Sequence, residues 1–147
     1  MIDHTWIGRT LPESRLDLER GRLRFFARAI GETNPIYTDV EAARAAGYAD
    51  LPAPPTFLFA AELDSGAVVK MLEEMKVPLS KLLHGEQGFS YFRPACAGDT
   101  ITVTSRITDI YDKKNGALEF VVKVSEARNQ DGDLVAELRT SLVCRNA

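Results

Sequence analysis

Two neighbouring segments, Phe26-Ala-Arg-Ala-Ile-Gly-Glu-Thr-Asn-Pro-Ile-Tyr-Thr-Asp39 and Ala46-Gly-Tyr-Ala-Asp-Leu-Pro-Ala-Pro-Pro-Thr-Phe-Leu58, decide how this chain folds. The first predicts a helix that ends at Gly31, since glycine tolerates the left-handed backbone of a helix end. An irregular loop with polar side chains follows it. The second predicts a proline-stiffened turn that opens into a long apolar helix. A polar loop that faces the start of a buried helix favours the binding of a polar reactive group.

Apolar residues on both sides of this loop recur at helical spacing. Before it, Leu23, Phe26, Ala27 and Ile30 form one stripe of an amphipathic helix that begins near Glu19. Within it, Asp39 is placed to cap a short helix over residues 39–46 that ends at Gly47. After it, apolar residues around most of the circumference predict a buried helix from about residue 56, with a kink or break near Gly66.

From residue 82 onward the apolar pattern changes to a period of two. Alternation over residues 82–91, 100–111, 117–127 and 134–143, with turn-like joins, predicts four strands of an antiparallel meander. Residues 11–18 suit a short edge strand or an extended approach. The sequence therefore predicts an α+β fold in which an antiparallel sheet is covered on one face by a buried helix.

Length and composition indicate one globular domain over residues 1–147. Apolar residues make up 45% of the chain and charged residues 27%, and the net charge is −3. Scattered basic residues and an acidic balance argue against a nucleic-acid partner. The longest apolar stretch contains Glu62 and Asp64, so no membrane span is expected, and without a signal-peptide pattern we expect a cytoplasmic protein. Cys96 and Cys144 form no pair or Cys/His cluster, so neither a disulfide framework nor a metal site is expected.

Four features in this order resemble the MaoC-like hotdog dehydratases. They are the segment 26–39, the turn 47–57, His84-Gly-Glu-Gln87, and Arg93-Pro94 followed by Ala97-Gly-Asp99. The chain is similar to the branch that forms the first half of double-hotdog hydratases, or the partner subunit of two-subunit (3R)-hydroxyacyl-thioester dehydratases. The resemblance implies a hotdog fold, with the sheet wrapped around a long central helix. It also implies a homodimer or heterodimer joined edge to edge, an acyl thioester of coenzyme A or acyl carrier protein, and no cofactor.

One departure from the family pattern concerns catalysis. Catalytic members carry Gly-Asp-x-Asn-Pro-x-His in the loop, and its Asp and His handle the water and the C2 proton. Glu32 and Tyr37 stand at those two positions here. Glutamate adds a methylene that can misplace a base, and tyrosine, with a reference pKa of about 10, is a poor proton shuttle at neutral pH. The pattern therefore favours a chain that lacks the dyad.

The candidate residues form two groups. Candidate catalytic groups are Glu32, Tyr37, His84 and Glu86, and candidate substrate-binding groups are Asn34, Thr56, Phe57, Leu58 and Arg93. Each also has a structural interpretation, such as Asn34 bonding to the loop backbone, Thr56 capping the helix and Tyr37 lining a cleft. His84 and Glu86 are expected on one face of a strand, and the N–H groups of Phe57 and Leu58 offer an oxyanion-type site.

Several functions remain open on the sequence alone. The first is a non-catalytic partner subunit that binds an acyl thioester beside a chain with the Asp/His dyad. A self-sufficient 3-hydroxyacyl-thioester dehydratase or hydratase would instead use Glu32 or His84 in a rearranged site. A non-catalytic acyl-CoA-binding module and an acyl-CoA thioesterase complete the alternatives.

Overall fold

A five-stranded, curled antiparallel sheet dominates the computed structural model, which describes residues 1–146. The order is β1-β3-β4-β5-β2, so the short β1 and the longer β2 are the two edges. The bounds are β1 Ser14–Asp17, β2 Leu82–Tyr91, β3 Thr100–Lys113, β4 Leu118–Arg128 and β5 Leu134–Arg145. All four predicted strands and the short edge strand are confirmed within a few residues.

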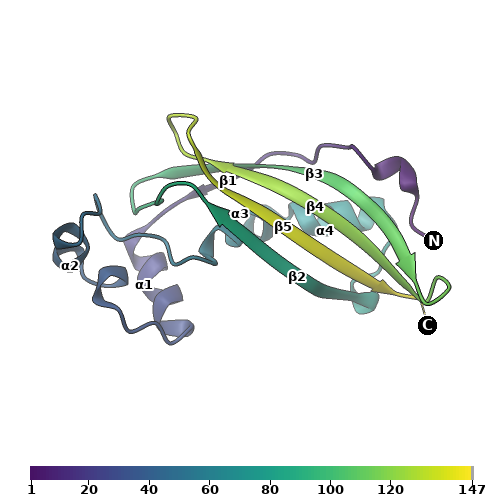
Figure 1. The fold of residues 1–147 in the computed structure, drawn as a ribbon, viewed down its shortest axis with the longest axis horizontal. Coiled ribbons are helices and arrows are strands. Elements are labelled where there is room, and N and C mark those ends of the chain that lie inside the picture. Colours follow the sequence, from purple (N-terminus) through teal and green to yellow (C-terminus); the bar gives the residue numbers. More distant parts are fainter. Residues whose placement is uncertain (147) are drawn as a thin grey trace.

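The helices lie on one face of the sheet and beyond one of its ends (Figure 1). Helices α1 and α2 lie together beyond one end of the sheet, α3 and α4 lie against its face, and both termini lie at the opposite end. None of the helices in residues 1–146 is long and apolar enough to cross a membrane. The bounds are η1 His4–Trp6, α1 Arg20–Ala29, η2 Pro35–Tyr37, α2 Val40–Ala45, η3 Phe57–Phe59, α3 Ala60–Asp64, α4 Ala67–Glu74 and η4 Leu79–Lys81.

The predicted signals at the ends of α1 and α2 are confirmed. Gly31 follows α1 with a φ of +73°, and Gly47 follows α2 with a φ of +96°. The Asp39 carboxylate accepts a hydrogen bond from the backbone N–H of Glu41 at 2.9 Å, which caps α2. One member of the predicted apolar stripe is wrong, because Ile30 lies past the end of α1 and is exposed.

The predicted long apolar helix is broken, as its sequence allowed. Gly66 has a φ of +71° between α3 and α4, and the Ser65 hydroxyl accepts a hydrogen bond from the N–H of Ala67 at 3.2 Å. The expectation that this helix is buried on most sides is wrong for the isolated chain. Leu63 is 56% exposed and Val69 is 49% exposed, because they lie on the side of the helices away from the sheet.

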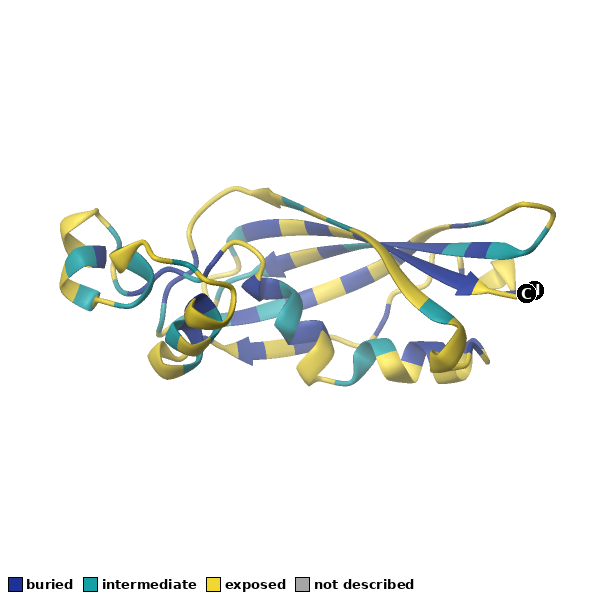
Figure 2. Cartoon of the chain, turned by 90° about the horizontal axis from the view of Figure 1, so that it is seen from below, coloured by how far each residue is buried: buried dark blue, intermediate teal, exposed yellow. Residues whose placement is uncertain are grey.

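Two apolar clusters fill the space between the sheet and the helices. The first cluster includes Leu23, Leu58 and Leu138, and the second includes Trp6, Leu72 and Leu142. The strands show the alternation of buried and exposed residues that a half-covered sheet requires (Figure 2). The α+β class is confirmed. The predicted four-strand meander is wrong for its first strand, because β2 crosses over to pair with β5 and does not pair with β3.

Candidate functional site

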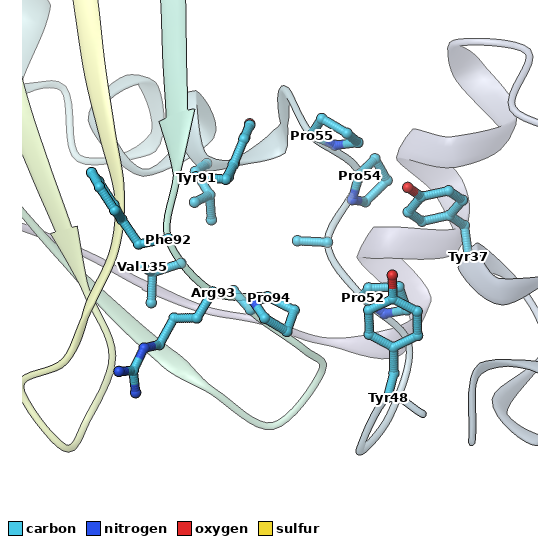
Figure 3. A pocket seen from close by; sticks show the side chains of 13 residues that line it. Tyr37, Tyr48, Pro52, Pro54, Pro55, Tyr91, Phe92, Arg93, Pro94 and Val135 are labelled. Carbon is cyan, nitrogen blue, oxygen red and sulfur yellow. The ribbon is translucent and has the colours of Figure 1, made fainter. Parts of the chain in front are cut away.

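A pocket of about 390 Å³ lies between the proline-rich turn and the end of β2. Tyr37 and Tyr48 lie on one side of it, and Tyr91 and Phe92 lie on the other, with the prolines between them (Figure 3). The lining residues are Tyr37, Tyr48, Pro52, Ala53, Pro54, Pro55, Leu58, Tyr91, Phe92, Arg93, Pro94, Ala95 and Val135. A mainly apolar pocket with a few polar groups is the usual form of a small-molecule site.

Backbone pairing holds the proline-rich turn against the connection between β2 and β3. The N–H of Ala53 donates to the carbonyl of Ala95, and the N–H of Ala97 donates to the carbonyl of Leu51, both at 2.8 Å. Pro52 and Cys96 form an isolated antiparallel bridge between the two segments. These contacts bring residues about forty positions apart into one wall of the pocket.

The hydroxyls of Tyr37 and Tyr91 are neutral at physiological pH, because the pKa of each is raised. Burial, together with the nearby Glu32 carboxylate and Tyr48, raises the pKa of Tyr37. Partial burial and the neighbouring Tyr37 raise the pKa of Tyr91 to about 12. Such hydroxyls can donate or accept hydrogen bonds, but they are poor general bases.

The loop after α1 uses its polar side chains to hold its own backbone. One Glu32 carboxylate oxygen accepts hydrogen bonds from the N–H groups of Thr33 and Asn34, both at 2.8 Å. The Asn34 side-chain oxygen accepts from the N–H of Ile36 at 3.2 Å, so the structural interpretation of Asn34 is confirmed. Neither Glu32 nor Asn34 lines the pocket, whereas Tyr37 does, as its cleft-lining interpretation predicted.

The start of the central helix differs from the expected cap and anion site. Thr56 makes no capping hydrogen bond with its side chain, so that interpretation is wrong; the first turn is a 3-10 turn instead. The N–H of Phe57 donates to the carbonyl of Pro54 at 2.9 Å, and its ring contacts Phe26 with centroids 5.1 Å apart. Leu58 alone of these three residues lines the pocket.

His84 and Glu86 lie on opposite faces of β2, contrary to expectation. His84 pairs with Leu142 and Glu86 with Ser141, so Gly85 is the extra residue of a bulge. A Cβ atom on Gly85 would lie 2.8 Å from the Val143 side chain, which explains the glycine. The His84 ring lies 5.1 Å from the Phe59 ring, centroid to centroid, and neither His84 nor Glu86 lines the pocket.

Arg93 lies at the rim of the pocket in the connection between β2 and β3. Its guanidinium forms an ion pair with Asp133, and both side chains are about half exposed. This position leaves the guanidinium accessible to an anionic group at the mouth of the pocket. The prediction of a strand-to-strand turn over residues 93–99 is confirmed, since β2 ends at Tyr91 and β3 begins at Thr100.

Sequence reasoning missed most of the pocket wall. Tyr48 and the prolines belong to a turn that the sequence marked as rigid, but Tyr91, Phe92 and Val135 carry no local signal of a site. Among the described residues that line the pocket, the titratable groups are Arg93 and the three tyrosines, and none is a carboxylate or an imidazole. Within residues 1–146, no group of three or more His, Cys, Asp or Glu side chains is arranged to hold a metal ion.

Comparison with known proteins identifies a family of the same architecture. Residues 5–138 match the sequence model described as FAS1-like, dehydratase domain region. A protein of Streptomyces avermitilis named UPF0336 protein is 41% identical over 99% of this chain and 97% of its own length.

Solved structures agree on the fold. One is the crystal structure of the C-terminally truncated HadBC (3R-hydroxyacyl-ACP dehydratase) complex from Mycobacterium tuberculosis. It is 28% identical with a TM-score of 0.81, over 94% of this chain and 96% of that chain. Another, named MaoC-like dehydratase, is 24% identical with a TM-score of 0.85, over 97% of this chain and 43% of that chain.

Proposed function

Because the chain belongs to the family of FAS1-like dehydratase domain regions, which have the MaoC-like hotdog fold, we propose that its pocket binds the acyl part of an acyl thioester. We further propose that the chain, as a single hotdog domain, is the partner subunit of a two-subunit (3R)-hydroxyacyl-thioester dehydratase. It shapes the binding space, while the second subunit supplies the acid and base that add or remove water.

The composition of the pocket wall is the observation that carries this proposal. Its aromatic, prolyl and aliphatic groups suit an acyl chain, and the hydroxyls of Tyr37, Tyr48 and Tyr91 are its polar groups besides Arg93. Dehydration of a 3-hydroxyacyl thioester requires a base for the C2 proton and an acid for the leaving hydroxyl. Glu32 bonds to its own loop instead, and Tyr37 has a raised pKa. A self-sufficient hydratase is therefore less well supported.

Arg93 is the residue that we assign to the carrier. The phosphate groups of coenzyme A and of the phosphopantetheine arm are anionic, and an exposed guanidinium at the rim can bind one of them. Asp133 already pairs with Arg93, so a phosphate would compete with that carboxylate or share the guanidinium. Neither the binding of the thioester nor the addition or removal of water needs a cofactor.

The open edge of β2 supports the partner role. In the sheet, β2 pairs with β5 along one edge, and its other edge is open. Leu83 and Tyr91 on this strand are 46% and 45% exposed. Long, unprotected edge strands are uncommon in isolated domains because they pair with other strands. We propose that a second hotdog chain pairs with this edge and covers the exposed Leu63 and Val69 of the helices.

Binding to a narrowed pocket tests the acyl-binding claim. Ala53 lines the pocket, so Ala53→Trp fills part of it and should weaken the binding of butyryl-CoA at least about tenfold. Isothermal titration calorimetry measures the dissociation constants. Ala29→Trp, on the exposed end of α1, is the matched control and should leave binding unchanged. Equal affinity of Ala53→Trp and the parent chain would contradict an acyl site in this pocket.

A further inference from the structure

A row of polar side chains crosses the helix-facing side of the sheet, where an apolar core is expected. Ser105 pairs with Ser125 across β3 and β4, and Lys123 pairs with Thr140 across β4 and β5. Thr140 pairs in turn with Gln87 of the edge strand β2. The polar belt, as we name it, consists of Ser105, Ser125, Lys123, Thr140, Gln87 and His84, with Glu62 from α3 above them.

Glu62 and Lys123 form the buried centre of the polar belt. The Lys123 ammonium lies 2.5 Å from one Glu62 carboxylate oxygen, and both side chains are at most 2% exposed. The other carboxylate oxygen accepts hydrogen bonds from Ser105 at 2.5 Å and Ser125 at 2.7 Å. Side chains of the sheet therefore bind both oxygens of the Glu62 carboxylate.

The edge of the polar belt is hydrogen-bonded as well. The Gln87 side-chain oxygen accepts from the Thr140 hydroxyl at 2.8 Å and lies 3.1 Å from the His84 Nε2 atom. The polar belt thus extends from the buried centre of the sheet to the open edge at β2.

The two apolar clusters of the core end at this polar belt. On β3, Val103 belongs to the first cluster and Ile107 to the second, and Ser105 lies between them. On β5, Leu138 and Leu142 belong to different clusters, and Thr140 lies between them. An apolar ligand in one half would have to cross polar groups that are joined by hydrogen bonds and an ion pair to reach the other half.

Two elements lead from the pocket directly to the polar belt. On the helix-facing side of β2, Tyr91 lines the pocket, Phe89 stacks on it with ring centroids 5.8 Å apart, and Gln87 is next. At the strand rise of about 3.3 Å per residue, Gln87 lies roughly 13 Å along β2 from Tyr91. Along the continuous turns of η3 and α3, Leu58 lines the pocket and Glu62 follows four residues later.

We propose that the polar belt sets the depth to which an acyl chain can enter from the pocket, and so limits the chain length that this protein binds. The inference rests on the proposed function, because it assigns the occupant of the pocket as an acyl group. Methylenes that pass Leu58 and Phe89 are buried against apolar groups and add affinity. Methylenes beyond them would have to displace hydrogen-bonded groups that have no other partner in the interior.

Binding of a homologous series of saturated acyl-CoA thioesters tests this limit. Titration calorimetry with acetyl-, butyryl-, hexanoyl-, octanoyl-, decanoyl- and hexadecanoyl-CoA should show affinity rising by roughly fourfold per buried methylene. In the parent chain, the affinity should stop increasing at an acyl chain length within this series. In Glu62→Leu/Lys123→Met, which replaces the buried pair by apolar groups of similar size, the rise should continue to longer chains.

Two further variants keep the result decisive. Gln87→Leu alters the polar belt at a half-buried position on the edge strand β2 and should also move the limit to longer chains. It takes the place of the double variant if that variant does not fold. Glu126→Leu/Arg128→Met removes an exposed ion pair at the end of β4 and should leave the limit unchanged. An unchanged limit in both belt variants, or no limit in the parent chain, would overturn the inference alone. No affinity of the parent chain for any acyl-CoA would contradict the proposed function itself.

Discussion

At the scale of single residues, Asp50 connects the pocket wall to the helices beside it. Its carboxylate accepts hydrogen bonds from the Arg20 guanidinium at 2.9 and 2.5 Å, and from the N–H of Leu51 at 2.8 Å. These bonds, chiefly that from Arg20, lower the pKa of Asp50 from 3.8 to about 2. The proline-rich turn is thereby fixed to the start of α1, in addition to its backbone hydrogen bonds with the β2–β3 connection.

The Asp50 carboxylate makes the stability of the chain depend on pH. A lowered pKa in the folded state means that its contribution is present above pH 3.8 and is lost as the pH falls toward 2. Asp50→Asn should cost about 1 kcal/mol or less at neutral pH, since the pair is partly screened by solvent. Urea unfolding at a series of pH values should show the two proteins converging below pH 3.8. A stability difference that is constant with pH would contradict this role.

The residue scale also marks the limit of sequence reasoning. Asn34 and Asp39 were predicted correctly because each bonds to backbone only two residues away. Glu62 and Lys123 are 61 positions apart and meet only after α3 packs against the sheet. No local sequence pattern predicts such a pair, and in the sequence Glu62 is only a charged residue within an apolar stretch.

At the scale of elements, the break in the central helix shows how one backbone position shapes the fold. Gly66 adopts a left-handed conformation that lets α4 begin in a new direction, and a Cβ atom there would meet nothing within 4 Å. Side-chain crowding therefore does not explain the glycine. Its requirement is conformational, since residues with a Cβ atom disfavour a positive φ.

Gly66→Ala should destabilise the chain by about 1 kcal/mol through backbone strain alone. Gly21→Ala is a matched control, because Gly21 lies inside α1 with open space around it and has no positive φ. That change should instead stabilise the chain by up to about 1 kcal/mol, as alanine favours helix. Chemical denaturation of both variants measures the difference. A Gly66→Ala protein at least as stable as the parent would contradict the interpretation of the break.

The elements were predictable to different degrees. Strands and the two helix caps follow from a period of two and from residues at the ends, which are local properties. The bulge at Gly85 was not predicted, and it moves Glu86 to the face opposite His84. A register shift depends on the partner strand, here on the close approach of Val143, so the sequence of β2 alone could not reveal it.

At the scale of the whole molecule, one end of the sheet carries the pocket and one edge remains open. The pocket lacks a base, and the edge of β2 with the exposed helix residues offers a surface for a second hotdog chain. The two features support each other, because a partner on that edge would lie beside Tyr91, which belongs to both. Both features fit the proposed function, in which this chain shapes a binding space and a partner subunit carries out the proton transfer.

Hydration of crotonyl-CoA tests this account most directly, followed as the loss of the conjugated thioester absorbance. The purified chain is measured alone and then with a hotdog chain that carries the loop Gly-Asp-x-Asn-Pro-x-His. We expect no turnover by this chain alone and turnover above that of the added chain when the two are mixed. Turnover by this chain alone that falls at least about a hundredfold in Tyr37→Phe would contradict the account, since that is the contribution of a general acid or base.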